Sequence, residues 1–173
     1  MMIQSVLIFV FLCLLTTAIA SGSLAPWVPS RKKDLIRIFK LADLKPGEIF
    51  YDLGCGDGRL TVCAAKNFKA RAIGIELALP LFFACAIKKL FNRNELLKFK
   101  LKNLFKENLA EADVVYIFAQ SPGKLKGKIK QKLENELKPG SRVITYAFPV
   151  EGWRPEIIDK PSDQDVAVYL YKF

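Results

Sequence analysis

A glycine-rich loop directly after an apolar strand segment constrains the fold of this chain more than any other feature. Residues 49–53 read IFYDL, which is typical of a buried strand, and the loop GCGDG follows at residues 54–58. Residues 60–68 then predict a helix. Glycines at the end of a strand let the backbone turn tightly and approach a ligand closely. This order therefore predicts an open α/β sheet with a ligand site at the carboxyl end of its first strand.

Strand and helix patterns alternate through the rest of the chain. Residues 72–76 and 113–118 are largely apolar runs, as expected for strands that are buried on both faces of a parallel sheet. Further helices are predicted at residues 30–41, with Ser30 as the N-cap, 81–91 and 125–137, and further strands at residues 99–101, 142–148, 155–158 and 166–173. Alternating strands and helices predict a parallel α/β sheet with helices on both faces.

Composition excludes several kinds of chemistry. The 173 residues contain no histidine, which excludes Ser–His–Asp and Cys–His catalysis and histidine-ligated zinc. The four cysteines form no CxxC pair, so they are predicted to be free thiols, and no metal site is expected. The formal charge of +10 indicates an anionic surface nearby, such as phospholipid headgroups or nucleic acid.

The first 23 residues are predicted to form a membrane anchor. Residues 3–24 would extend roughly 33 Å as a helix at ~1.5 Å per residue, which is enough to cross a hydrocarbon core. Arg31, Lys32 and Lys33 follow the apolar run, and no lysine or arginine precedes it. Positive charge at the carboxyl end favours keeping that end in the cytoplasm. We therefore expect a single-pass membrane protein whose remaining residues, 24–173, form one domain facing the cytoplasm.

Two other interpretations of the first 23 residues stay open. Ala18-Ile19-Ala20 has the A-x-A pattern of a signal-peptide cleavage site. An apolar helix of this length can also lie in the core of a soluble domain. The three interpretations differ in whether the segment stays with the mature protein and in what surrounds it.

Charge and spacing in the glycine loop indicate which ligand it takes. Glu76 ends the second predicted strand, where its carboxylate can accept hydrogen bonds from a ribose diol. Dinucleotide loops read G-x-G-x-x-G and offer bare amides to a pyrophosphate. This loop reads G-x-G-x-G, with Asp52 before it and Asp57 inside it, and two carboxylates suit a ligand that carries an ammonium and a sulfonium. The residues therefore predict S-adenosylmethionine as the cofactor, with a structural turn that binds no ligand as the alternative.

The D-x-G-x-G-x-G pattern with a following acidic strand end resembles the class I, seven-β-strand S-adenosylmethionine-dependent methyltransferases. Three elements are similar to a narrower group: PWVPS at residues 26–30, YDLGCGDGR at 51–59, and Phe148-Pro149 followed by Gly152-Trp153. That group comprises the membrane-anchored mitochondrial protein-lysine methyltransferases, which modify the adenine nucleotide translocase and the ATP synthase c-subunit, and their prokaryotic relatives. The resemblance implies a Rossmann-like, mostly parallel seven-stranded sheet over residues 24–173, preceded by one N-terminal transmembrane helix.

The resemblance also implies roles for the positions that match the cofactor motifs. In this chain the cofactor-binding residues are then Asp52, Gly54, Cys55, Gly56, Asp57, Gly58, Glu76, Leu77, Asn103 and Leu104. Glu76 would hold the ribose hydroxyls, and Leu77 would pack on the adenine. Many members carry an acidic residue where this chain has Asn103, whose Oδ1 can still accept from the adenine amino group.

The predicted catalytic residues are Gln120, Ser121 and Tyr146. Gln120 and Ser121 follow the fourth strand. In the family that the sequence resembles, the methyl group is transferred to the acceptor at this position. A lysine acceptor must first lose its proton, and with a pKa near ~10.4 only about one lysine in ~2,500 is neutral at pH 7. A slot lined by aromatic side chains such as Trp27 and Phe118 would lower that pKa by desolvation.

Together these features predict a membrane-tethered, S-adenosylmethionine-dependent methyltransferase that modifies lysine in a membrane protein. A tether raises the effective concentration of membrane substrates. A methyltransferase for a small molecule, a lipid or a quinone is one alternative, and a non-catalytic cofactor-binding or RNA-binding protein is another. The chain lacks the Asn/Asp-Pro-Pro-Tyr motif of enzymes that methylate nucleic-acid amino groups, so nucleic acid is not the expected partner.

Overall fold

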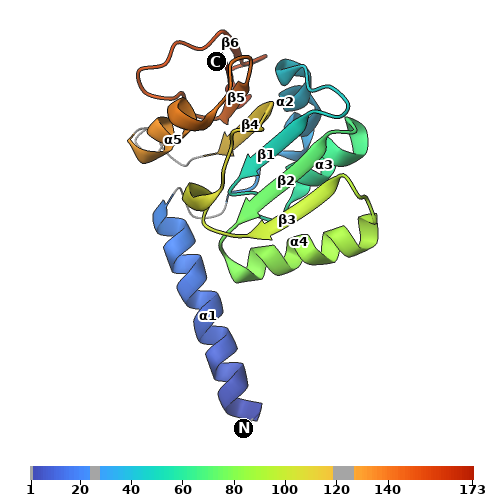
Figure 1. The fold of residues 1–173 in the computed structure, drawn as a ribbon, viewed down its shortest axis with the longest axis vertical. Coiled ribbons are helices and arrows are strands. Elements are labelled where there is room, and N and C mark those ends of the chain that lie inside the picture. Colours follow the sequence, from blue (N-terminus) through green and yellow to red (C-terminus); the bar gives the residue numbers. More distant parts are fainter. Residues whose placement is uncertain (1, 24–27, 119–126) are drawn as a thin grey trace.

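A seven-stranded sheet organises the protein in the computed structural model, which describes residues 2–23, 28–118 and 127–173 (Figure 1). The strand order is β3-β2-β1-β4-β5-β7-β6. The strands are β1 (Ile49–Leu53), β2 (Arg71–Glu76), β3 (Leu97–Leu101), β4 (Val114–Phe118), β5 (Arg142–Tyr146), β6 (Ile157–Asp159) and β7 (Val168–Lys172). The first five are mutually parallel, whereas β7 is antiparallel to both β5 and β6. The predicted Rossmann-like, mostly parallel seven-stranded sheet is confirmed.

Helices cover both faces of the sheet. They are α2 (Leu35–Ala42), α3 (Arg59–Asn67), α4 (Leu79–Asn92) and α5 (Lys128–Glu136), with 3-10 turns η1 (Lys32–Asp34) and η2 (Leu104–Lys106). Side chains alternate across each strand, so Phe50 of β1 packs with α2 and α3 while Tyr51 and Leu53 pack with α5 on the other face. The two apolar cores therefore lie on opposite faces of one sheet.

The strand order reverses at β1. The chain passes from β1 outward to β2 and β3, then returns to place β4 on the other side of β1. In open α/β sheets this reversal leaves a crevice beyond the carboxyl ends of the two central strands. The glycine loop at residues 54–58 begins at that edge of β1, which is where the sequence predicted a ligand site.

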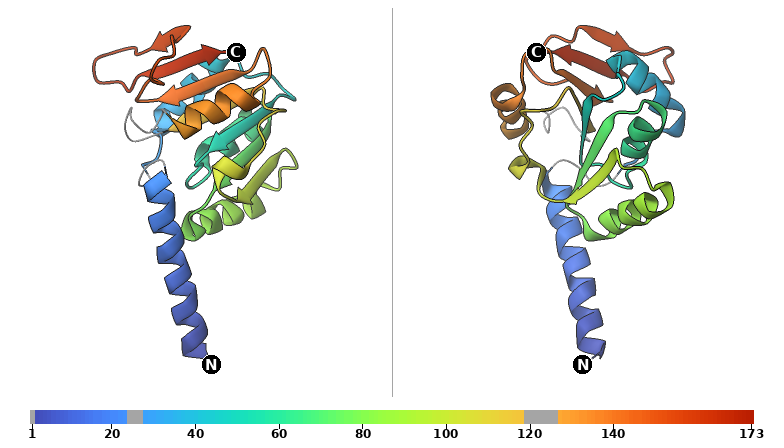
Figure 2. Two further views of the ribbon diagram at one scale, coloured as in Figure 1. Left: turned by 60° about the vertical axis from the view of Figure 1, so that its left-hand side comes forward. Right: turned by 45° about the vertical axis from the view of Figure 1, so that its right-hand side comes forward.

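The first helix, α1 (Met2–Ser23), projects away from the domain (Figures 1 and 2). Its window Ile3–Ala20 has the length and the apolar composition needed to cross a membrane, and none of that window is buried. Contacts between α1 and α4 include a hydrogen bond and a ring contact: the Leu79 backbone N–H donates to Thr16 Oγ1 over 3.2 Å, and the Phe9 and Phe83 ring centroids are 5.8 Å apart. The helix is therefore not a core helix of the domain, although it touches the domain along α4.

The prediction that Ser30 caps the next helix is wrong. That helix enters through η1, and α2 begins only at Leu35. The Ser30 hydroxyl is instead 2.7 Å from the hydroxyl of Tyr116, a buried side chain of β4. A buried tyrosine hydroxyl needs a hydrogen-bond partner, and this need outweighs the local preference of serine for a helix N-terminus.

Candidate cofactor and methyl-transfer site

A pocket lies at the carboxyl ends of β1, β2 and β4. Its lining includes Asp52, Gly54, Cys55, Gly56, Asp57, Glu76, Leu77, Asn103 and Leu104, nine of the ten residues that the sequence predicted to bind a cofactor. Gly58 is buried behind the lining. Segments that are far apart in the sequence complete the wall, among them Ser30, Tyr116 and Phe118. The topology thus brings the predicted residues into one site.

The loop between β1 and α3 is held in a conformation that only glycine adopts easily. Gly54, Gly56 and Gly58 have φ angles of 80°, 57° and 74°. The backbone N–H groups of Gly54 and Cys55 both donate to the Ile75 carbonyl over 2.9 Å, which fixes the loop to the end of β2. At Gly58 a Cβ would also lie 2.6 Å from the Phe99 ring, so its missing side chain is a packing requirement.

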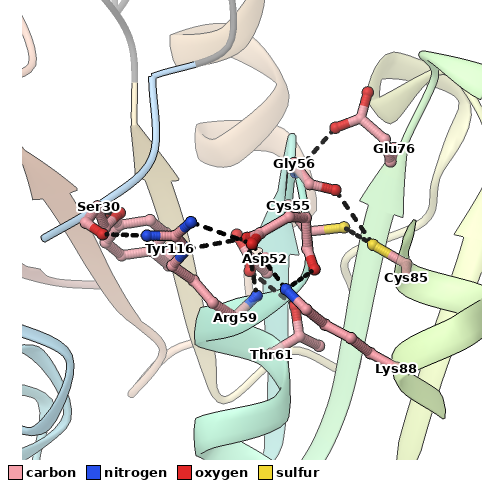
Figure 3. Close-up of polar contacts among 11 residues, drawn as sticks. Ser30, Asp52, Cys55, Gly56, Arg59, Thr61, Glu76, Cys85, Lys88 and Tyr116 are labelled. Carbon is pink, nitrogen blue, oxygen red and sulfur yellow. Dashed lines mark hydrogen bonds and ion pairs between the residues drawn. The ribbon is translucent and has the colours of Figure 1, made fainter. Parts of the chain in front are cut away.

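Glu76 is held by three backbone donors, and Figure 3 shows its contact with one of them, Gly56. Its Oε2 accepts from the Gly56 N–H over 2.9 Å, and its Oε1 accepts from the N–H groups of Leu77 and Ala78 over 2.8 Å each. Burial raises the pKa of the carboxyl group, while these backbone hydrogen bonds act in the opposite direction. A carboxylate offers about four acceptor positions, so Oε2 keeps one for a ligand hydroxyl. This geometry fits a ribose diol.

Asp52 is a buried residue of the pocket lining. Its Oδ2 accepts a hydrogen bond from Thr61 Oγ1 over 2.7 Å. Burial raises the pKa of Asp52 to about 7, and the nearby carboxylates of Glu76 and Asp57 add to this shift. A cation placed in the pocket would favour the ionised form of Asp52. The group is therefore suited to a positively charged ligand such as a sulfonium with an ammonium.

Asp57 is ion-paired with two cations of the chain, Arg59 and Lys88. Arg59 Nε lies 2.9 Å from Oδ1, and Lys88 Nζ lies 2.6 Å from Oδ2. Burial opposes ionisation, but the hydrogen bonds from Arg59 and Lys88 outweigh it and lower the pKa of Asp57 to about 2. The charge of Asp57 is thus matched within the protein, whereas Asp52 accepts from the uncharged hydroxyl of Thr61.

Asn103 and its neighbours form another part of the lining. The Asn103 Oδ1 accepts from the Phe105 N–H over 2.9 Å and so caps η2. A carbonyl oxygen has two lone pairs, which leaves one for an adenine amino group. Leu77 and Leu104 line the same pocket and supply apolar surface for a flat base.

The predicted catalytic residues are only partly described. Gln120, Ser121 and the aromatic Trp27 lie outside the described residues. Tyr146 is buried behind the lining: its hydroxyl donates to Asp34 Oδ2 over 2.5 Å, and its ring packs edge-on against Phe118 at 4.9 Å. The structure therefore brings Tyr146 against a wall of the pocket through Phe118.

Sequence reasoning missed several residues of the site. Thr17 and Ala20 of α1 line the pocket, and nothing in an apolar helix signals such a contact. Lys88 was also missed, because its ion pair with Asp57 forms only when α4 packs back over the loop. Arg59 directly follows the loop, and an arginine two positions after Asp57 was a signal for their pairing.

Comparison with known proteins finds a family of methyltransferases. The sequence family described as the ANTKMT methyltransferase domain matches residues 52–157. A protein-lysine N-methyltransferase of Saccharolobus islandicus is 36% identical over 153 residues, which cover 84% of this chain and 92% of that protein. The human ATP synthase c-subunit lysine N-methyltransferase is 30% identical, and the match covers 83% of this chain but 60% of the human protein.

A solved structure shows the same fold. An RNA methyltransferase from Salinibacter ruber in complex with S-adenosyl-L-homocysteine superposes with a TM-score of 0.78 at 30% identity, covering 84% of this chain and 93% of that one. The expected S-adenosylmethionine-binding methyltransferase fold is confirmed, and the pocket residues fit that cofactor. This chain belongs to the ANTKMT methyltransferase-domain family of class I S-adenosylmethionine-dependent methyltransferases.

Proposed function

We propose that this chain is an S-adenosylmethionine-dependent protein-lysine N-methyltransferase, held on a membrane by α1, that modifies a lysine of a membrane protein. One observation carries the proposal: Thr17 and Ala20, from the membrane-length helix, line the same pocket as Glu76 and Asp52. An acceptor that reaches this pocket passes beside the end of the anchor. Relatives named as lysine methyltransferases of the ATP synthase c-subunit and of the adenine nucleotide translocase support a lysine acceptor.

The proposed anchor is residues 1–23, and the proposed methyltransferase domain is residues 24–173. Arg31, Lys32 and Lys33 follow the anchor and favour a domain on the cytoplasmic side. Cleavage after Ala20 would remove Thr17 and Ala20 from the pocket wall and leave its apolar end open. This contact favours an anchor that stays with the protein over a cleaved signal peptide.

The walls of the pocket suit an amine that must become neutral. The cofactor supplies an electrophilic methyl group on a sulfonium, and a lysine acceptor has to lose its proton before it can take that group. Tyr116 and Phe118 line the pocket, and an apolar, aromatic slot lowers the pKa of a lysine by removing water from its charged form. We assign Gln120 and Ser121 to directing the amine, and Tyr146 to positioning Phe118.

A methylation assay on native membranes tests the proposal. Membranes from cells that lack this protein are incubated with the full chain and S-adenosylmethionine carrying a heavy methyl group, and peptide mass spectrometry locates the label. We expect heavy methyl-lysine in a membrane protein, and at least about tenfold less of it when the enzyme carries Glu76→Gln and the cofactor is subsaturating. Heavy methyl groups on other side chains alone would contradict a lysine acceptor.

A further inference from the structure

The outer face of α4 is a continuous apolar surface. Phe83, Ile87, Leu90 and Phe91 are 45%, 56%, 68% and 80% exposed. Their spacing of four, seven and eight residues from Phe83 places them on one side of the helix. An exposed stripe of this kind, with two phenylalanines, is a feature of surfaces that contact a protein or a membrane. We call these four residues the α4 face.

The opposite side of α4 contacts the cofactor loop. Cys85 is buried, and its thiol donates to the Gly56 carbonyl over 3.1 Å. Lys88 Nζ donates to the Asp57 carbonyl over 2.7 Å and pairs with the Asp57 carboxylate. Because these contacts fix the rotation of the helix, the α4 face must point away from the domain.

The position of α1 identifies what the α4 face meets. The first turn of α4 is hydrogen-bonded to Thr16, which lies within the Ile3–Ala20 window, and Phe83 packs on Phe9 near the middle of that window. Figures 1 and 2 show α4 along the side of the domain from which α1 projects. If the window spans a bilayer, the start of α4 and Phe83 lie beside lipid, and the rest of the α4 face follows from them along the helix.

We infer that the α4 face is a lipid-binding surface that lies in the membrane interface beside the anchor. Exposed Lys89 and Arg93 neighbour the face and can reach anionic headgroups, as basic residues do on interfacial helices. The inference rests on the proposed anchoring of α1. It places the cofactor loop one helix away from the bilayer, so that the pocket opens at the membrane surface.

Photolabelling from the lipid phase tests the α4 face. The full chain is reconstituted into vesicles of phosphatidylcholine and phosphatidylglycerol that contain a trace of phospholipid with a diazirine in its acyl chain. After illumination, mass spectrometry locates lipid adducts on peptides from α1 and from residues 79–92. We expect adducts on both segments. Adducts on α1 alone would overturn the proposal that the α4 face binds lipid, but would still support the anchor. This is also the result expected if a second copy of the chain covers the α4 face.

Adducts on neither segment would contradict both the anchor and the α4 face. A matched pair of variants sharpens the result. The double variant Ile87→Glu, Leu90→Glu should lower labelling of residues 79–92 about tenfold and leave labelling of α1 unchanged. A tenfold loss is the effect expected when two large apolar side chains no longer favour contact with lipid. Ile158→Glu is the control, because Ile158 is 59% exposed on β6, away from α4. Equal labelling of residues 79–92 in the double variant and the control would overturn the inference, and thermal unfolding followed by circular dichroism confirms that each variant is folded.

Discussion

At the scale of single residues, Glu76 combines cofactor binding with loop structure. Its carboxylate holds the N–H groups of Gly56, Leu77 and Ala78, so Glu76→Ala would remove a structural acceptor as well as a ligand contact. Glu76→Gln keeps an acceptor oxygen and removes the charge. We expect it to weaken S-adenosylhomocysteine binding by about 1.5–3 kcal/mol, the range for a hydrogen bond to a charged group. Isothermal titration calorimetry measures the loss, with exposed Glu134→Gln as the control; wild-type affinity in Glu76→Gln would refute the ribose contact.

Asp52 predicts a pH dependence of cofactor binding. Its pKa is about 7 in the free protein because it is buried, and a bound cation would lower that pKa. Binding then releases a proton, so affinity for S-adenosylmethionine falls as the pH drops through the pKa of the free protein. From about pH 7 to about pH 6 the ionised fraction falls about fivefold, which sets the expected loss of affinity. Calorimetry at both pH values checks this; Asp52→Asn should bind weakly with little pH dependence, and an equally steep dependence in that variant would contradict the assignment.

Local sequence was enough to predict the residues of the loop but not their partners. The sequence identifies Asp52, the loop glycines and Glu76 because they lie at the ends of strands and are separated by fixed numbers of residues. The ion pair between Asp57 and Lys88 depends on how α4 packs back over the loop. Such a contact is set by tertiary structure, so the prediction that both carboxylates serve a cationic ligand did not include it.

At the scale of secondary-structure elements, Tyr146 links β5 to η1. Its hydroxyl donates to Asp34, which also pairs with Arg37. Tyr146→Phe leaves buried Asp34 with one donor fewer, so we expect the free energy of unfolding to fall by about 1–3 kcal/mol. Urea denaturation measures this fall, with half-buried Tyr169→Phe on β7 as the control. If Tyr146→Phe retains turnover, the Tyr146 ring acts by positioning Phe118. A loss of kcat without a loss of stability would instead mean that the hydroxyl takes part in the reaction.

The order of the elements was predictable because hydrophobic patterns are local. Predicted strands at residues 72–76 and 113–118 correspond to β2 and β4, and the predicted helix at residues 60–68 corresponds to α3. Ser30 shows the limit of that approach. Its hydroxyl contacts Tyr116, which is 86 positions away, and no local pattern records that pairing. The same limit applies to Thr17 and Ala20 in the pocket wall.

At the scale of the whole molecule, residues of a membrane-length helix line the cofactor pocket. The net charge of +10 and the named activity of the Salinibacter ruber protein make RNA the main competing acceptor. Binding driven by phosphate contacts weakens steeply with salt, whereas insertion of α1 into lipid does not. We therefore expect the full chain to stay with vesicles in high salt during flotation; release by salt would contradict an inserted anchor.

The proposed reaction transfers methyl groups from S-adenosylmethionine to lysine in a membrane protein. A single experiment compares all the candidate acceptors: the full chain and radiolabelled S-adenosylmethionine are incubated with a membrane extract that contains RNA, and protein, RNA and lipid are then separated. We expect the label in the protein fraction, released as methyl-lysine on hydrolysis, and lowered at least about tenfold with Glu76→Gln at subsaturating cofactor. Label confined to RNA or to lipid would contradict the proposed reaction.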